Sequence, residues 1–293
     1  MKTIKTVILA VTLSITSGVT LCAQWSANMQ RDKQILSDFF AQVQAEVGES
    51  MGSVVVKSAL FFLNTPYVGR TLEAGGDEEQ LVINLRELDC TTFMENCVVL
   101  SRVLKKHTPD FESYVNCLQQ IRYRAGVVNG YLSRLHYTTD WIADNTAKGV
   151  LEDVTQKIGG EPWSVQLSYM SSHPDAYVHL RGAPERTERI RQIEELVSKR
   201  GNYYYIPKQK IDSLRSGILS GDLIGFTTSI EGMDISHVAI ACWQDDTLTF
   251  IHASSTDKKV IINPESIADY CAGIKSNTGI VVLRCMPVAP AAP

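Results

Sequence analysis

Apolar and polar residues follow two different periods in the two parts of the chain. Up to about residue 200 the apolar residues recur at steps of three and four, the period of an amphipathic helix. This pattern predicts helices over residues 27–47, 51–63, 90–104, 114–123 and 184–199. Further along, short apolar runs between turn residues predict strands over 203–206, 222–227, 237–243, 248–253, 260–262 and 280–284, with a helix over 264–271. The order indicates an α+β fold in which a helical N-terminal part packs against an antiparallel sheet.

The helix expected after Leu88 has a cysteine in its first turn. Asp89 is a good N-cap, because its side chain can accept a hydrogen bond from a free backbone N–H group of that turn. One apolar stripe then runs along the helix through Cys90, Phe93, Cys97, Leu100 and Leu104. The helix start favours a thiolate at Cys90, whereas the charge of Asp89 opposes it. A small buried cysteine without a chemical role is the alternative interpretation.

Two histidines are predicted to lie on neighbouring strands. If Asp245 and Asp246 form the turn and Gln244 pairs with Thr247, then His252 lies opposite Ala239. Side chains alternate along strands, so His237 and His252 then share one face on diagonal positions, about 7–8 Å apart at Cα. The two imidazoles are therefore expected to touch, although each histidine by itself is also compatible with a structural role.

Composition bounds the class of protein. The chain has 293 residues, 44% hydrophobic and 20% charged, which is typical of a globular protein. Residues 1–23, with Lys2 and Lys5 before a short apolar run, are interpreted as a signal peptide cleaved after Ala23. The run is too short for a membrane anchor, and a lipoprotein anchored through Cys22 is the less favoured alternative. We therefore expect an exported protein, periplasmic or secreted, without stable membrane insertion, in which residues 24–293 form one domain with a helical N-terminal subdomain over about 24–85.

Charge argues against a nucleic-acid-binding protein, and cysteine spacing argues against a cysteine-rich zinc site. Removal of Lys2 and Lys5 lowers the formal net charge from −4 to −6, and no basic run offers a footprint for nucleic acid. The remaining cysteines, Cys90, Cys97, Cys117, Cys242, Cys271 and Cys285, lack the short paired spacing of a zinc site. No metal and no cofactor is expected.

Residues 126–145 have an unusual composition. Aromatic, cationic and hydroxyl side chains are dense here, as in clefts that stack on and hydrogen-bond to a sugar or a peptide; they are Tyr131, Ser133, Arg134, His136, Tyr137 and Trp141. A half-buried interface between helices would have the same composition. Both interpretations stay open at this point.

Four motifs, in order, resemble the papain-like NlpC-type cell-wall peptidases. They are Asp89-Cys-Thr-Thr-Phe93, Gly221-Asp-Leu-Ile224, His237-Val-Ala-Ile240 and Ile251-His-Ala-Ser254. The stretches from Tyr131 to Trp141 and from Tyr205 to Lys208 look like those of the N-acetylmuramoyl-L-alanine amidase-like branch. The chain departs from the wider family at Thr91, where Ser is common, and before Cys90, where Thr65-Pro-Tyr67 replaces a Trp-Gly-Gly run.

The resemblance implies a papain-like catalytic domain with a Cys-His-His triad. Cys90 would be the nucleophile, His237 the base and acid, and His252 the group that orients His237. Tyr67, with the aromatic, cationic and hydroxyl residues of the 126–145 segment, would bind substrate, and Asp222 would cap or orient. His136 and His173 are alternative bases, but neither lies in a comparable strand pair.

The implied activity is that of a secreted cysteine amidase. It would hydrolyse the N-acetylmuramoyl–L-alanine bond of peptidoglycan-derived sugar–peptide fragments (muropeptides). Three alternatives remain: a stem-peptide endopeptidase that cuts after D-glutamate, a non-enzymatic muropeptide-binding protein, and a zinc hydrolase built on Cys90, His237 and His252. The absence of repeated wall-binding modules favours a soluble fragment as the substrate.

Overall fold

An eight-stranded antiparallel sheet is the centre of the structure, a computed structural model that describes residues 27–73, 78–106 and 109–288. The strand order is β2-β3-β8-β4-β5-β6-β7, and β1 pairs with β8. The strands are β1 (Leu151–Asp153), β2 (Glu161–Trp163), β3 (Tyr203–Pro207), β4 (Leu223–Thr228), β5 (Ile235–Gln244), β6 (Thr247–Ser254), β7 (Lys259–Ile262) and β8 (Asn277–Cys285). The expected α+β architecture, with helices against an antiparallel sheet, is confirmed.

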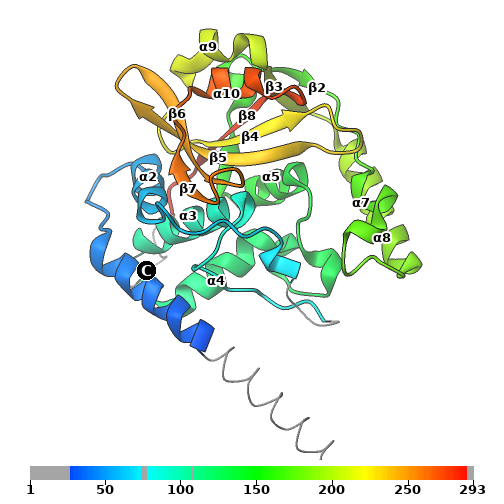
Figure 1. Cartoon of the computed structure of the whole chain (residues 1–293), viewed down its shortest axis with the longest axis horizontal. Coiled ribbons are helices and arrows are strands. Elements are labelled where there is room, and N and C mark those ends of the chain that lie inside the picture. Colours follow the sequence, from blue (N-terminus) through cyan, green and yellow to red (C-terminus); the bar gives the residue numbers. More distant parts are fainter. Residues whose placement is uncertain (1–26, 74–77, 107–108, 289–293) are drawn as a thin grey trace, which may run out of the picture.

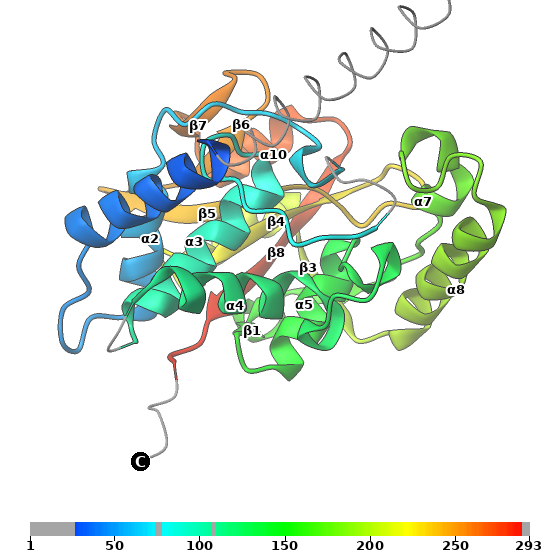
Figure 2. The same ribbon diagram turned by 90° about the horizontal axis from the view of Figure 1, so that it is seen from below.

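Helices cover both faces of this sheet (Figures 1 and 2). Residues 27–42 are helical, and the longer helices that follow are α2 (Met51–Phe61), α3 (Cys90–Leu104), α4 (Phe111–Arg122), α5 (Thr138–Ala147), α8 (Pro184–Arg200) and α10 (Ile267–Gly273). Three short helices, α6 (Thr155–Ile158), α7 (Tyr169–Ser172) and α9 (Ile211–Leu214), complete the set. The helices from α2 to α5 lie on one side of the sheet, and α9 and α10 lie on the other.

Alternation along the strands divides the core in two. Leu223, Ile240 and Ile251 point to the side of α2, α3 and α4, where they join the largest apolar cluster. Their neighbours Ile224 and Phe250 point to the side of α9 and α10. Because both faces are covered, β4 is buried along its whole length instead of alternating between buried and exposed residues.

A smaller apolar cluster lies to one side of the main core. There α7 and α8 pack against the segment that contains Tyr131 and Tyr137 (Figure 2). As expected from its charged sequence, α8 exposes most of its length, but it buries Ile190 and Val197 in this cluster. The 126–145 segment is thereby fixed between the main core and α8.

The structure departs from the sequence prediction at element ends, at two strands and at several helices that were not predicted, of which α5 is the longest. The first helix ends at residue 42, not 47, and α2 ends at Phe61, two residues early. The helix expected over 264–271 begins at Ile267, where the Ser266 side chain caps it. Strands β1 and β2 were not predicted, because each has only three residues and neither shows an apolar alternation.

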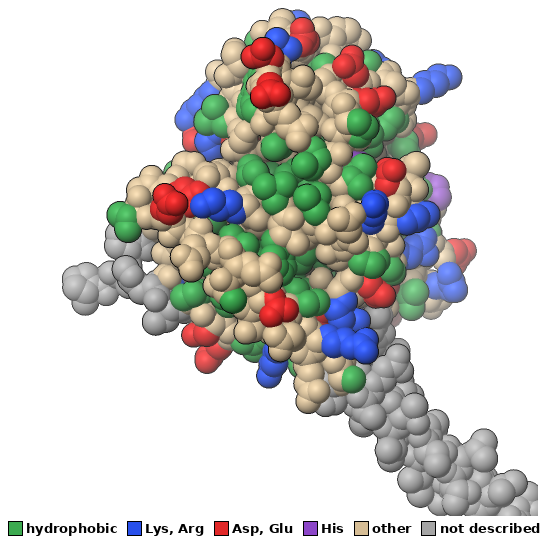
Figure 3. All heavy atoms as spheres, turned by 60° about the vertical axis from the view of Figure 1, so that its left-hand side comes forward, with side chains coloured by type: hydrophobic (Ala, Val, Ile, Leu, Met, Phe, Trp, Pro, Cys, Tyr) green, Lys and Arg blue, Asp and Glu red, His purple; other side chains and the backbone are tan. Residues whose placement is uncertain are grey.

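The molecular surface shows no segregation of charge on the face in Figure 3. Lys and Arg side chains lie among Asp and Glu, around hydrophobic side chains that gather at the middle of the face. In the described ranges, no helix is both long enough and apolar enough to cross a membrane. The proposed signal peptide, residues 1–23, and Cys22 lie outside those ranges.

Candidate active site at the head of α3

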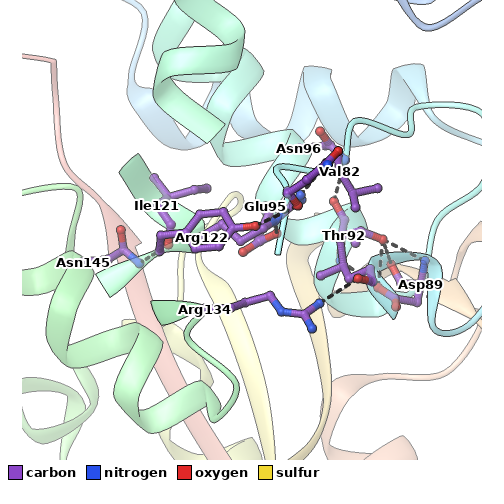
Figure 4. Close-up of polar contacts among 12 residues, drawn as sticks. Val82, Asp89, Thr92, Glu95, Asn96, Ile121, Arg122, Arg134 and Asn145 are labelled. Carbon is purple, nitrogen blue, oxygen red and sulfur yellow. Dashed lines mark hydrogen bonds and ion pairs between the residues drawn. The ribbon is translucent and has the colours of Figure 1, made fainter. Parts of the chain in front are cut away.

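Cys90 is the first residue of α3, as the sequence predicted. The Asp89 side chain accepts a hydrogen bond from the Thr92 N–H at 2.8 Å, and the Thr92 hydroxyl accepts one from the Asp89 N–H at 2.9 Å (Figure 4). This capping box uses the short polar side chains at both positions and fixes where the helix begins. The half-buried Cys90 thiol is thereby held at the N-terminal end of a buried helix.

Buried polar contacts hold α3 against α4. Glu95 pairs with Arg122 at 2.7 Å, and both side chains are almost wholly buried (Figure 4). At the next residue of α3, the Tyr114 hydroxyl donates to Asn96 at 2.6 Å, and the Asn96 amide donates to the Thr92 carbonyl. Removing one partner of such a buried pair leaves the other uncompensated, so these contacts specify how α3 packs on α4.

The two strand histidines touch, as the hairpin pattern predicted. Gln244 pairs with Thr247, so Asp245 and Asp246 form the turn. The Nε2 atom of His237 lies 2.7 Å from the Nδ1 atom of His252, within hydrogen-bond distance. Because this contact occupies Nε2 of His237, its Nδ1 is the ring nitrogen left for another partner.

Cys90 lies near the backbone of β5 at Val238, the residue that follows His237. The β5–β6 ladder ends at the pair Ile240–Ile251. Ala241 donates its N–H toward the β4 side, so the N–H of Val238, three residues earlier, points toward the β6 side. There it is close enough to the Cys90 thiol to oppose the rise in the pKa of that thiol. The thiol thus lies against the backbone of the residue that follows His237.

The thiol and both imidazoles are uncharged at neutral pH. Burial raises the pKa of Cys90 to about 11, and the negative charge of Asp89 acts in the same direction against the hydrogen bonds from Val238 and Thr91. Burial lowers the pKa of His237 to about 3, and His252 adds to this effect. Burial likewise lowers the pKa of His252 to about 4. The sequence left the net shift at Cys90 open; the structure decides it in favour of the thiol.

Aromatic rings enclose the histidine pair. Phe226 stacks on His237 at 5.9 Å between ring centroids, and Phe250 lies 4.8 Å from His252. Tyr270 of α10 lies 6.3 Å from His237 and 6.0 Å from His252. Sequence analysis gave Tyr270 no role, since no local pattern distinguishes it from a core residue of an amphipathic helix.

Tyr67 lies beside the cysteine. Its backbone bridges to Leu88, and its N–H donates to Lys258 at 2.8 Å, so the 65–67 segment runs between the head of α3 and the β6–β7 turn. The Cys90 and Asp89 side chains are close enough to contribute to the raised pKa of the Tyr67 hydroxyl, of which burial is the main cause. Tyr67 is therefore placed where a substrate-binding residue is expected.

A cavity of about 420 Å³ extends from the head of α3. Asp89, Thr91 and Glu95 form its α3 side, and residues 134–138 form another part of its wall. Tyr177 and Met233 also line it. The 126–145 segment thus lines a cavity that begins at Asp89 and Thr91, the two neighbours of Cys90 in the chain.

Most side chains of that segment are nevertheless occupied by protein contacts. Arg134, labelled in Figure 4, is buried. It donates to the Leu72 carbonyl at 3.0 Å and to Glu73 at 2.8 Å, and its Nε lies 3.3 Å from Glu79. The Tyr137 hydroxyl donates to Glu194 at 2.7 Å and accepts from the Met170 N–H at 2.9 Å. These two residues shape the cavity wall, but their polar ends already have partners.

The other residues predicted to bind substrate either line the cavity or are used within the protein. Trp141 is 2% exposed and belongs to the main core, so its ring is not a surface for a sugar. The Ser133 hydroxyl donates to the Gly130 carbonyl and closes a turn. Tyr131 is buried between His136 and His179, at 4.3 and 4.7 Å between ring centroids. Of the six residues proposed in this segment, Arg134, His136 and Tyr137 line the cavity beside Cys90.

The alternative bases have other partners. A ring nitrogen of His136 contacts the Tyr131 carbonyl, and His173 contacts the Tyr169 carbonyl. Asp222 forms a two-point ion pair with Arg284 and accepts from the Leu219 N–H, which fits an orienting role. Only His237 and His252 form a histidine pair near the cysteine within the described part of the chain.

All six cysteines between residues 78 and 288 are free thiols, Cys90 included. In the described ranges, no three His, Cys, Asp or Glu side chains are grouped so that they could hold a metal ion.

Comparison with known proteins gives this arrangement a family. A family model described as N-acetylmuramoyl-L-alanine amidase-like (AmiA-like) matches residues 57–280. A crystal structure of an N-acetylmuramoyl-L-alanine amidase from Bacteroides uniformis is 38% identical, with a TM-score of 0.75 over 80% of this chain and 99% of that chain. A proposed xylanase from Bacteroides fragilis is also 38% identical, with a TM-score of 0.73 over 78% and 98% of the two chains.

A more distant likeness shows the fold alone. A Legionella pneumophila protein is 23% identical, with a TM-score of 0.69 over 90% of this chain and 98% of that one. No curated protein matches the chain. The family model spans most of the sequence, including Cys90, His237 and His252, so the chain belongs to the N-acetylmuramoyl-L-alanine amidase-like (AmiA-like) family.

Proposed function

We propose that this protein is an exported cysteine amidase that hydrolyses the amide between N-acetylmuramic acid and L-alanine in peptidoglycan fragments. The observation that carries the proposal is the position of Cys90, whose sulfur contacts the β5 backbone beside His237, while His237 contacts His252. Family membership and the name of the Bacteroides uniformis relative supply the bond and the substrate class.

The chemistry follows from the proton positions. Cys90 would attack the lactyl carbonyl carbon while its proton moves to Nδ1 of His237, since Nε2 is occupied by His252. The tetrahedral oxyanion would lie at the start of α3, where the Cys90 N–H has no partner within the helix. His237 would then protonate the L-alanine nitrogen, the C–N bond would break, and a thioester to the sugar acid would remain. Water activated by the same imidazole would hydrolyse the thioester and restore the thiol.

The uncharged resting state suits this order of events. With the pKa of Cys90 raised to about 11 and that of His237 lowered to about 3, proton transfer is unfavourable before substrate binds. Attack and proton transfer are therefore expected to occur together, with the developing oxyanion stabilised by the helix start. His252 would keep the His237 ring in the orientation that points Nδ1 at the thiol.

The cavity beside Asp89 and Thr91 is the proposed site for the substrate. Its volume of about 420 Å³ is within the range of small-molecule sites, and its wall combines aromatic and charged side chains. Tyr67 lies beside the same sulfur. We assign these surfaces to fragment binding.

Alternative activities make different demands on the site. A glycosidase, as the name of the Bacteroides fragilis relative would suggest, needs two carboxyl groups across the scissile bond and makes no use of a thiol and a histidine pair. A binding protein needs neither the thiol nor the histidine pair. A stem-peptide endopeptidase would use the same catalytic groups, so only the products distinguish it.

The test is mass spectrometry of a defined disaccharide–tetrapeptide before and after incubation with the mature chain. Release of a free disaccharide and an L-alanine-headed tetrapeptide supports the amidase. An internally cut stem supports the endopeptidase. Unchanged substrate, or equal turnover by wild type and Cys90→Ala, refutes the proposal. Activity that is lost with a chelator and restored by zinc would favour the metal alternative.

A further inference from the structure

The contact between the two histidines allows two proton arrangements. Either the His237 Nε2–H donates to Nδ1 of His252, or the His252 Nδ1–H donates to Nε2 of His237. In the first arrangement Nδ1 of His237 carries a lone pair and can accept the thiol proton. In the second Nδ1 is already protonated and cannot. The distance of 2.7 Å does not distinguish them, so another group must decide between them.

That group has to stabilise a proton on Nε2 of His252, the ring nitrogen that does not contact His237. If Nε2 of His252 carries the proton, its Nδ1 is an acceptor and the productive arrangement follows. Nε2 is buried and has no hydrogen bond of good geometry in the described ranges. A buried N–H needs an acceptor nearby, and without one the proton gains little by staying on Nε2.

Sheet register places Asn263 close to the His252 side chain. His252 pairs directly with Ile261 of β7, and Asn263 follows two residues later, so its side chain is on the same face and diagonal to His252. Asn263 is 7% exposed. Its side chain is close enough to raise the pKa of His252 through a hydrogen bond.

The orientation of the Asn263 amide is set by a second contact. Its Nδ2 donates to the Glu265 carbonyl at 3.2 Å, and because a carbonyl oxygen can only accept, the nitrogen must face Glu265. The amide oxygen is then left for His252. The backbone is also held: the Asn263 N–H donates to Phe250, and the Thr249 hydroxyl contacts the carbonyls of Asn263 and Glu265.

The other polar groups around His252 do not offer this acceptor. Asp257, in the turn after β6, acts on His252 through its charge, while its carboxylate accepts from the Ser254 hydroxyl at 2.7 Å. Tyr270 of α10 packs against the ring at 6.0 Å between centroids. Nδ1 of His252 already has His237 as its partner, and Cys90 lies near the backbone of Val238.

We propose, on the basis of the proposed thiol amidase, that Asn263 is a positioning residue: its amide oxygen accepts the Nε2 proton of His252 and so fixes the tautomers of both histidines. His252 Nδ1 becomes the acceptor, the His237 proton stays on Nε2, and Nδ1 of His237 faces the thiol as a base. Cys90, His237, His252 and Asn263 would thus form one chain of contacts. Asn263 acts only through His252.

Two substitutions separate this role from a structural one. Asn263→Asp keeps an oxygen acceptor for His252 but loses the N–H donor to Glu265, whereas Asn263→Leu loses both. If Asn263 only held the loop, the two variants would be equally impaired. The proposal predicts that Asn263→Leu lowers kcat about 10- to 100-fold with little change in KM, while Asn263→Asp stays within a few-fold of wild type. Thr249→Val is the control, because it loosens the same loop without touching His252, and its kcat should match wild type.

The tautomers themselves are measured by NMR of protein labelled with ¹⁵N-histidine, without substrate. In wild type, His237 and His252 are expected to be protonated on Nε2, with signals assigned by their loss in His237→Gln and His252→Gln. In Asn263→Leu the His252 signal should shift toward the Nδ1-protonated form. This readout does not depend on activity, so it remains valid even if Cys90→Ala retains turnover and the proposed function fails.

Three results would overturn the inference. They are a wild-type His237 protonated on Nδ1, a folded Asn263→Leu variant with kcat within two-fold of wild type, and an Asn263→Asp variant as slow as Asn263→Leu. Folding of each variant is checked by its thermal transition.

Discussion

The reactivity of Cys90 toward a neutral alkylating agent should depend on pH in an unusual way. Only the thiolate is alkylated, and burial with the Asp89 charge raises the pKa of Cys90 to about 11. At pH 7 about one thiol in ten thousand is then ionised, compared with about one in thirty for a free cysteine of pKa about 8.5. We expect iodoacetamide to react roughly 300-fold more slowly than with such a cysteine, for equal access and intrinsic reactivity.

The shape of the profile is more informative than the rate. The rate should rise about tenfold per pH unit from pH 7 to about pH 10, because the ionised fraction does so. In the same range His237 stays neutral, since its pKa is lowered to about 3. For the same reason kcat/KM should not fall near pH 6, where a histidine of ordinary pKa would become protonated.

The assay is peptide mapping by mass spectrometry after timed alkylation. Mapping separates Cys90 from the other cysteines in the described ranges, which are buried. Asp89→Asn is the matched variant: asparagine caps a helix as well as aspartate does but lacks its charge, so the profile should move to lower pH. A rate that is already high at pH 5 and flat to pH 8 would refute the reasoning, because it is the signature of a thiolate–imidazolium pair.

Two further predictions concern the histidine pair and the buried hydroxyl of Tyr137. His237→Ala should remove activity, whereas His252→Ala should retain a measurable fraction, because an orienting group can be partly replaced by water; equal rates for His237→Ala and wild type would reject the assignment. Tyr137→Phe deprives the Met170 N–H and Glu194 of a buried partner, which should cost about 3 kcal/mol and lower Tm by roughly 6–12 °C. Calorimetry measures this loss; kcat of the folded variant should stay within about two-fold, and a large fall in kcat at unchanged Tm would instead indicate a direct role in substrate binding.

Local sequence signals determined the two halves of the site separately. A capping residue and its partner three positions later are adjacent in the chain, so Asp89 and Thr92 placed Cys90 at a helix start without help from the rest of the fold. The turn at Asp245 and Asp246 likewise set the strand register, and the register placed His237 and His252 on one face. Period and turn chemistry act over a few residues, and these predictions needed nothing more.

Tertiary structure decided how those halves meet and what surrounds them. The contact between Cys90 and Val238 depends on where the β5–β6 ladder ends, which no local pattern encodes. Arg134 pairs with Glu73 and Glu79, which lie more than fifty residues earlier in the chain. The composition of the 126–145 segment therefore suggested that Arg134 binds a ligand, whereas in the fold its partners are these two carboxylates. Burial, not the helix start, sets the pKa of Cys90, because the cost of desolvating a charge depends on everything packed around it.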